Sequence, residues 1–224
     1  MPKTAPDTAA LSQTASDAIT KRPPQQARSR RSQVKVLTAA RTLLEDEGYD
    51  SLTLQKVSRL SGVSIGSIYG RFTGKDELMR AVQAVLMEEM EIAHRALLDP
   101  GRWTGVPLPR LVPELFDGFA DLLRQFAPAL RQMMLRAIQD PEISRVGTQS
   151  YLSFVEQAMA VLRLVRDEVR RDPPDQALHF ALFAAFSIYR NHLGFGSDKG
   201  EMPDVEWAVL KRQTNEMVIG YLLG

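Results

Sequence analysis

The sequence predicts an all-α protein with a small N-terminal domain and a larger C-terminal helical domain. Two short helical segments joined by a glycine turn occupy residues 53–71. Beyond residue 100, prolines stand at the starts of successive apolar segments with helical spacing, where a missing N–H costs no hydrogen bond. The 224 residues suffice for both domains, and 44% of them are hydrophobic, which allows a sizeable core.

The first segment before the glycine turn is amphipathic. Leu54, Val57 and Leu60 recur at three-residue spacing, which predicts a short helix with one apolar face. Thr53 is a suitable N-cap, because its hydroxyl can accept a hydrogen bond from an unpaired backbone N–H. Gly62 can adopt a positive φ and end this helix, which a residue with a Cβ does only at a cost.

The second segment after the turn has a different outer face. Ser64 can cap it, and Ile68 and Phe72 lie four residues apart and should face the core. The outer side carries small and polar residues such as Gly66 and Ser67. A helix with such a face can enter a DNA major groove about 12 Å wide, so the pair is interpreted as a helix-turn-helix DNA reader.

Two other interpretations use the same residues. Residues 62–66 match G-x-S-x-G, the serine turn of α/β-hydrolases, which would make Ser64 a nucleophile. That turn requires a buried strand before it, and the segment LQKVSRLS has helical spacing instead, so we predict no enzyme and no catalytic residue. A helical adaptor that binds other proteins through apolar helices is the second alternative, but it leaves a basic N-terminal segment, Tyr69 and Lys75 unexplained.

A longer pattern of residues surrounds the turn at fixed spacing: Val36-Leu37, Ala40, Leu43-Leu44, Gly48-Tyr49, Thr53-Leu54, Val57-Ser58, Ser61-Gly62-Val63-Ser64, Gly66-Ser67-Ile68-Tyr69, Phe72, Lys75 and Leu78. Over residues 32–80 this order resembles the N-terminal DNA-binding domain of the TetR family of bacterial transcriptional regulators. Ser58, Gly70 and Thr73-Gly74 depart from the usual pattern of that family. Gly70 also removes a side chain that could contact DNA.

The resemblance implies that some residues contact DNA phosphates and others contact the bases. Thr53, Tyr69 and Lys75 are expected to hold phosphates, with the Tyr69 ring packed inward. Base reading is expected from the exposed side of the second helix and one helper before it: Ser64, Ile65, Gly66, Ser67 and Gln55. A single reader of this size binds weakly, so a homodimer on a near-palindromic double-stranded operator is expected.

Charge is concentrated before the first helix. The net charge is +1, yet residues 1–31 hold six Lys or Arg against two Asp, a local excess of +4. These residues have almost no large apolar side chain, so we expect a disordered basic arm in which Arg28, Arg30 and Arg31 contact DNA. Without cysteines, disulfides and thiolate metal sites are excluded, and no metal or cofactor is predicted. No apolar run of about 20 residues and no signal-peptide core occur, so a soluble, cytoplasmic protein with no membrane partner is expected.

The expected organisation is a basic arm over 1–31, the DNA-binding domain over 32–80 and an effector-binding and dimerisation domain over 81–224. Helices are expected over 32–47, 53–60, 64–71, 75–98, 110–126, 128–138, 142–170, 174–194 and 204–222. Residues 103–109 and 194–202 are expected to be loops.

The last two helices are the candidates for dimerisation, because small residues allow close approach and the resemblance implies a four-helix bundle at this position. The predicted interface comprises Ala177, Ala181, Ala184, Trp207, Leu210, Met217 and Tyr221. The alternative is that these side chains close the core of a single subunit.

The resemblance also implies a pocket for a small-molecule effector in the C-terminal domain. Methionine and aromatic side chains suit an apolar pocket that repacks around a ligand. The candidates are Met87, Met90, Phe116, Phe119, Met133, Met134, Tyr151, Phe154, His179 and Phe183, with plain core packing as the alternative for each. An apolar or amphipathic ligand that shifts the helix after Lys75 would release a dimeric repressor from its operator. Repression rather than activation follows only the tendency of the family.

Overall fold

The computed structural model describes residues 24–195 and 205–224. Within these ranges every regular element is a helix, which confirms the all-α prediction. The elements are α2 (Pro24–Glu47), α3 (Leu54–Ser61), α4 (Ile65–Tyr69), α5 (Lys75–Leu97), α6 (Pro100–Trp103), α7 (Leu108–Ala137), α8 (Pro141–Leu162), the 3-10 helix η1 (Arg163–Glu168), α9 (Pro174–His192) and α10 (Trp207–Leu223).

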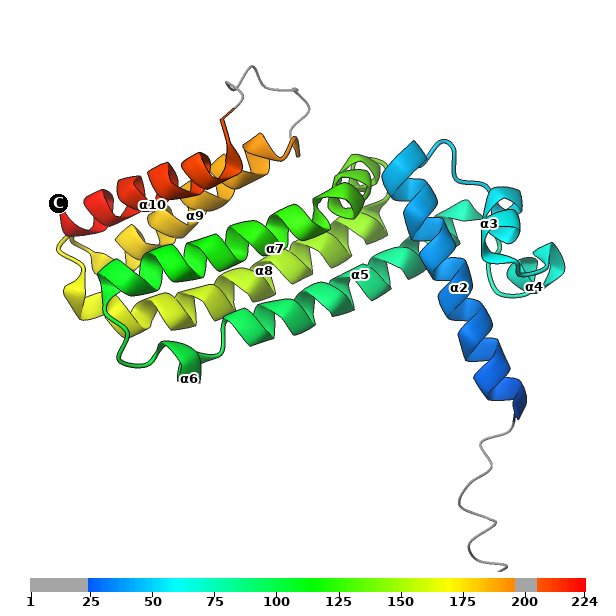
Figure 1. Ribbon diagram of the computed structural model, residues 1–224, viewed down its shortest axis with the longest axis horizontal. Helices are drawn as coiled ribbons and strands as arrows, with labels where there is room; N and C mark the ends of the chain where they lie inside the picture. The colour runs from blue at the N-terminus through cyan, green and yellow to red at the C-terminus, as the bar shows by residue number, and fades with distance from the viewer. Residues whose placement is uncertain (1–23, 196–204) are drawn as a thin grey trace, which may run out of the picture.

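The helices form a small head and a long bundle (Figure 1). The head contains α2, α3 and α4, and α5 leaves it to run beside α7 and α8 in the bundle. Helices α9 and α10 pack against each other and against α7 along the side of the bundle opposite α5. Helix α5 therefore belongs to both parts, and the boundary expected at residue 80 lies inside it.

Two apolar cores correspond to this division. One lies in the bundle, around Trp103, Phe116 and Tyr189. The other is centred in the head, on residues such as Val36 and Ile68, but it also includes Phe126, Met133 and Ile143 from α7 and α8. Because the head core continues into the bundle, a displacement of α7 or α8 reaches the helices of the head directly.

Helix α7 differs from the sequence expectation, because residues 108–137 form one helix in place of two segments separated before Pro128. Pro113 and Pro128 both lie inside it. A proline inside a helix removes a hydrogen bond and costs about 3 kcal/mol. Phe126, Ala127, Ala129 and Met133 around Pro128 are all buried, and this apolar burial offsets that cost.

Several other boundaries also differ from the expectation. Helix α2 begins at Pro24 and not at residue 32, so residues 24–31 are helical and not part of a disordered arm. Residues 1–23, the rest of the predicted arm, lie outside the described residues. The segment predicted to be helical through residue 170 changes to a 3-10 helix at Arg163, where Val165 has non-helical angles. Residues 100–103 form the short helix α6, which no expected helix includes and which begins at Pro100 with Asp99 as its N-cap.

No helix in residues 24–195 and 205–224 is long and apolar enough to cross a membrane. Across the same residues, no group of three or more His, Asp or Glu side chains could hold a metal ion.

Candidate functional site

The turn between α3 and α4 is fixed by hydrogen bonds from its own residues. The Thr53 hydroxyl caps α3 by accepting from the backbone N–H of Lys56 at 3.2 Å. Gly62 ends α3 with φ of 67°, in the left-handed region that favours glycine. The Ser58 hydroxyl donates to the carbonyl oxygen of Val63 at 2.7 Å, so this serine ties the helix to the turn. The angle between the two helices is thereby set by local chemistry.

Helix α4 is shorter than predicted and ends at Tyr69. Ile68 is fully buried and anchors it to the head. The side chains predicted to read bases are exposed on the outer face of the helix or at its start: Ser64, Ile65, Gly66 and Ser67. Ser64 caps the helix, and its hydroxyl lies 2.8 Å from that of Ser67. The segment before the turn is the helix α3 and not a strand, so the hydrolase geometry for Ser64 is absent.

The residues expected to hold phosphates surround α4. Thr53 and Gln55 are exposed at the start of α3. Tyr69 is 52% exposed, so the prediction that its ring packs inward is wrong; helix α4 ends at this residue, and Ile68 beside it takes the buried position. Lys75 begins α5 and places its Nζ 4.0 Å from the centre of the Tyr49 ring. This cation–π contact holds the lysine stem beside the head and leaves its charge available at the surface.

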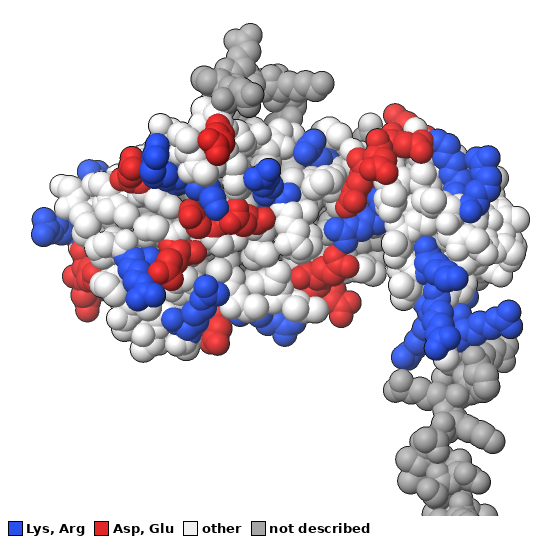
Figure 2. Space-filling view, in the orientation of Figure 1, with Lys and Arg blue, Asp and Glu red and all other residues white. Residues whose placement is uncertain are grey.

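A basic groove lies between α2 and the helix-turn-helix. It is lined by Arg28, Arg31, Lys35, Arg71, Ser29, Ser32 and the residues Gly62, Val63, Ser64 and Ser67 of the turn and of α4. The Arg71 guanidinium donates to the hydroxyls of Ser32 and Ser29, each at 3.2 Å, and so joins the start of α2 to the end of α4. Figure 2 shows the resulting cluster of Lys and Arg on the first turns of α2, at the end of the molecule away from the bundle. Arg30, predicted with its neighbours, is exposed but does not line the groove.

Sequence reasoning missed Lys35 and Arg71 as members of this groove. Arg28, Arg31 and Lys35 follow each other at intervals of three and four residues, which places them on one face of a helix. That signal depends on recognising that the helix starts at Pro24, a proline position typical of a first helical turn.

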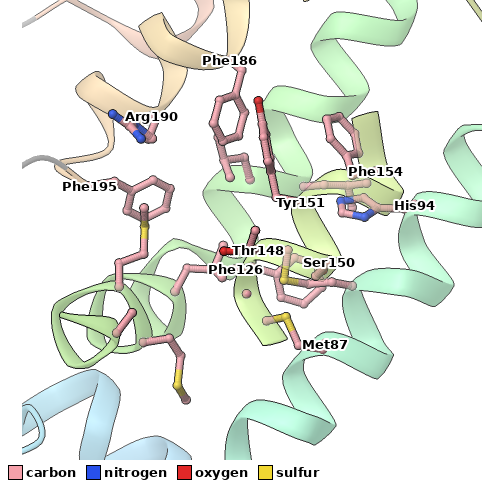
Figure 3. Close-up of a pocket in the computed structure, with 18 of the residues that line it drawn as sticks. Met87, His94, Phe126, Thr148, Ser150, Tyr151, Phe154, Phe186, Arg190 and Phe195 are labelled. Atoms are coloured by element: carbon pink, nitrogen blue, oxygen red, sulfur yellow. The ribbon is translucent and has the colours of Figure 1, made fainter. Parts of the chain in front are cut away.

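The bundle contains a cavity of about 530 Å³ between α5, α7, α8 and α9 (Figure 3). Eight of the ten predicted ligand-binding residues line it, whereas Phe116 and His179 do not. Phe116 is buried in the bundle core, and His179 is exposed on the outer side of α9. The polar lining includes Gln83, His94, Ser144, Thr148, Ser150, Ser187 and Arg190.

His94, and not His179, is the histidine of the cavity. It is 5% exposed, and its ring centre lies 4.8 Å from that of Phe154. Burial lowers the pKa of His94 below its usual value, so the imidazole is neutral near pH 7. The spacing of His94 from Met87 and Met90, seven and four residues earlier, places all three on one face of α5 and could have identified it.

Residues 36–82 match the family model for bacterial regulatory proteins of the tetR family. An uncharacterized HTH-type transcriptional regulator, YfiR of Bacillus subtilis strain 168, is 24% identical over 174 residues, which cover 76% of this chain and 84% of that protein. Residues 36–82 of this chain form a DNA-binding domain of the TetR family. Members of this family are transcriptional regulators, not enzymes, so this chain is a DNA-binding transcriptional regulator.

Solved structures share the fold of this TetR-family regulator. The TetR-family regulator PfmR of Thermus thermophilus is 18% identical, with a TM-score of 0.56 over 84% of this chain and 97% of that chain. GusR of Salmonella enterica is 19% identical, with a TM-score of 0.58 over 85% of this chain and 95% of that chain.

The predicted dimer residues of this TetR-family chain divide into two groups. Ala177, Ala181 and Leu210 are buried within the subunit, which favours the alternative that these side chains close the core of a single subunit. They face inward because α9 and α10 pack against each other and against α7. Ala184, Trp207, Met217 and Tyr221 keep exposed surface.

An apolar surface on α9 and α10 accompanies the second group. Phe180 is 53% exposed, Phe183 is 59% exposed and Met217 is 45% exposed. The ring centre of Phe180 lies 5.1 Å from that of Tyr221, which joins the surfaces of the two helices. We call Phe180, Phe183, Met217 and Tyr221 the apolar face of α9 and α10.

Polar contacts connect the head of this TetR-family chain to the bundle. The Tyr49 hydroxyl donates to Asp76, and Arg136 of α7 donates to the same carboxylate at 3.2 Å. Burial, followed by this bond to Asp76, raises the pKa of Tyr49 to about 12, so the hydroxyl stays protonated. The Arg136 guanidinium also lies 4.4 Å from the centre of the Tyr49 ring. The turn after α2, the start of α5 and the end of α7 therefore meet at one cluster.

A second set of contacts lies between α5 and the start of α8. Arg80 donates to Asp140, whose side chain is 2% exposed and caps α8 through the backbone N–H groups of Glu142 and Ile143. Burial alone would raise the pKa of Asp140, but these hydrogen bonds lower it below its usual value and keep the carboxylate charged. Gln83 donates from Nε2 to the Ile143 carbonyl oxygen at 2.9 Å, and both residues line the cavity.

Proposed function

We propose that this TetR-family regulator is a dimeric repressor that binds a near-palindromic operator and is released from it by a small molecule in the bundle cavity. The proposal that the protein binds DNA rests on the exposed outer face of α4, which lies beside the basic groove of α2 and Arg71. A DNA partner also implies that the protein acts in the cytoplasm.

The DNA contacts follow from these positions. Thr53, Tyr69 and Lys75 hold phosphates on the flanks of the major groove and carry no sequence information. Arg28 and Arg31, together with Lys35 and Arg71, add sequence-independent attraction, with Arg30 beside them on α2. Sequence is read by Ser64, Ile65, Gly66 and Ser67, with Gln55 nearby: hydroxyls meet base edges, and the Ile65 side chain meets a thymine methyl.

Two glycines of the α4 segment provide a matched test of this assignment. A Cβ added at Gly66 meets no atom within 4 Å, and one added at Gly70 meets only ordinary contacts with the carbonyl oxygens of Gly66 and Ser67. Both Gly66→Ala and Gly70→Ala are therefore expected to stabilise the protein slightly, by about 0.4–1 kcal/mol. Gly66→Ala is expected to change which base is preferred at one operator position, since Gly66 lies in the first turn of α4. Gly70 follows the end of α4, where a longer side chain could reach DNA but a single methyl group should not, so Gly70→Ala is expected to leave the base preference unchanged.

Thermal unfolding and operator binding of both variants check this expectation. An unchanged base preference in Gly66→Ala, together with a changed preference in Gly70→Ala, would contradict the proposed orientation of α4.

The apolar face of α9 and α10 supports dimerisation. Exposed phenylalanines are costly in water, and Phe180 and Phe183 lie three residues apart on α9, with Phe180 in contact with Tyr221 of α10. A second copy related by two-fold symmetry brings the same face against it, because a two-fold interface is self-complementary. The two heads can then engage half-sites about one helical turn, or ~34 Å, apart.

Helix α5 supports a route from ligand to DNA. Its C-terminal half contributes Met87, Met90 and His94 to the cavity, and its first residue is Lys75 of the head. A ligand that displaces α5 or α8 strains the contacts of Gln83 and Arg80 and so shifts the head. The ligand then weakens DNA binding by the same factor by which DNA weakens ligand binding.

A variant with a filled cavity tests this route. Gly147 of α8 lines the cavity, and a Cβ there meets only Gln83 Nε2, at 4.0 Å. Gly147→Leu is expected to keep the fold and operator affinity while it blocks ligand binding and ligand-induced release. Gly147→Ala, which adds one methyl group, is the control and should leave release largely intact. Loss of operator binding in Gly147→Leu without ligand would show that the apo state needs an open cavity.

Repression is tested by transcription in vitro from a promoter that carries the selected operator. A repressor lowers transcript yield when added alone, and an activator raises it. Restored transcription on addition of a cavity ligand would support release, whereas a ligand that tightens operator binding would contradict it.

A further inference from the structure

The charges of the cavity restrict its ligand. Of the described residues that line it, none is Asp or Glu, and Arg190 is the one side chain with a full charge at pH 7. A ligand cation would lose water without meeting a lining carboxylate, which is unfavourable in an apolar site. A ligand anion can instead pair with Arg190, which lies at the exposed edge of the cavity.

His94 supplies a second polar point at the opposite, buried end. No described residue donates to or accepts from its imidazole, although His94 is 5% exposed. Because His94 lines the cavity, a ligand there can supply the hydrogen-bond partner that the protein does not. Because the neutral ring has one N–H and one bare nitrogen, it can donate to a carbonyl or hydroxyl oxygen and accept from a hydroxyl.

A row of rings joins the two points. The ring centre of Phe154 lies 4.8 Å from that of His94 and 4.4 Å from that of Phe119, and Phe119 lies 5.8 Å from Phe186. Arg190 follows Phe186 by one turn of α9. Figure 3 shows His94 and Arg190 on opposite sides of the cavity, with Phe186 and Tyr151 between them. An apolar ligand body can lie along this row.

We propose that the ligand of this cavity is an amphipathic organic anion, whose acid group pairs with Arg190 and whose distant hydroxyl or carbonyl group hydrogen-bonds to His94. This inference rests on the proposed function only in taking the cavity as the effector site. It assigns that site a class of molecule and the two residues that recognise it.

The test measures binding of a defined set of probes to the full-length protein by titration calorimetry, in the absence of DNA. The probes are straight-chain ω-hydroxycarboxylates, the carboxylates without the hydroxyl, the corresponding diols and the simple alcohols. Chains of about eight to sixteen carbons are used, a range set by a volume of about 530 Å³ and about 30 Å³ per water-sized group.

Wild-type protein is expected to bind the best-fitting ω-hydroxycarboxylate up to about tenfold more tightly than the carboxylate without the hydroxyl, the value of one neutral hydrogen bond. In His94→Phe, which keeps a ring against Phe154, this ratio should fall to about one. His94→Gln, which can still hydrogen-bond, should recover part of it. The ratio compares two probes in one protein, so a general loss of stability does not change it.

Arg190→Gln should lower the affinity ratio of carboxylate to alcohol up to about fivefold, as expected for an exposed charge pair. Arg110→Gln and His179→Phe, both outside the cavity lining, are the controls and should change neither ratio. Tighter binding of alkylammonium probes than of carboxylates, equal ratios in wild type and variants, or no binding of any probe would overturn the proposal.

Operator release is measured separately with the probe that binds best. Binding that depends on His94 and Arg190 without release of DNA would keep the assigned ligand class and refute the ligand-responsive repressor. Release of DNA by ligands whose binding does not depend on His94 or Arg190 would refute the assigned ligand class and keep the ligand-responsive repressor.

Discussion

Replacing Tyr69 and Lys75 together with alanine is expected to weaken operator binding about a thousandfold. Each side chain is assigned one phosphate contact, and a dimer makes each contact twice. At about 1 kcal/mol per hydrogen bond, four lost contacts amount to about 4 kcal/mol, or about three powers of ten in the dissociation constant. Fluorescence anisotropy of labelled operator DNA at fixed salt measures this change.

The fold should survive the double substitution. Tyr69 is half exposed, and Lys75 contributes to the fold mainly through its contact with the Tyr49 ring, worth about 0.5–1 kcal/mol. Arg110→Ala, on the exposed surface at the start of α7, removes a positive charge at the end of the bundle away from the head (Figure 1) and should leave operator affinity almost unchanged. An equal loss of operator affinity in the double variant and in the control variant would mean that net charge, and not these two contacts, determines binding.

Placing glutamate at both Phe180 and Met217 is expected to dissociate the dimer. In a two-fold interface the double variant buries four carboxylates without partners, and removing the partner of one buried charge already costs about 3–5 kcal/mol. The dimer dissociation constant should therefore rise more than about a thousandfold. Sedimentation velocity at several protein concentrations measures it.

Both positions are half exposed in the subunit, so the monomer should remain folded. Ile138→Glu is the matched control, because Ile138 is an exposed apolar residue at the end of α7, away from the apolar face of α9 and α10. If Ile138→Glu dissociates the dimer and the double variant does not, the interface lies on another surface.

The sequence was most informative where structure is determined locally. Thr53, Gly62 and Ser64 act through their own backbone neighbours, so their capping and turn positions could be predicted from residue type alone. The start of α2 was missed because the polar composition before residue 32 was interpreted as disorder. Its helix is instead joined to the head by contacts from Arg71, 39 positions away from Ser32.

Errors in the bundle have a common physical cause. Helical spacing shows which residues share a face but not which face meets a neighbour. The small residues Ala177 and Ala181 therefore pack inside the subunit, while Phe180 and Phe183 of the same helix stay exposed. The sequence predicts His179 as a cavity residue, whereas His94 lines the cavity. The physical reason is the same, because the surroundings of each histidine depend on helices distant in sequence.

Selection of binding sites from a random DNA library tests the central claim most directly. The purified wild-type protein is expected to enrich a near-palindrome with half-sites about one helical turn, or ~34 Å, apart. The Tyr69→Ala, Lys75→Ala double variant should fail to enrich it under the same conditions. No enrichment at low salt, or enrichment of a single unrepeated site, would contradict a dimeric, sequence-specific DNA reader.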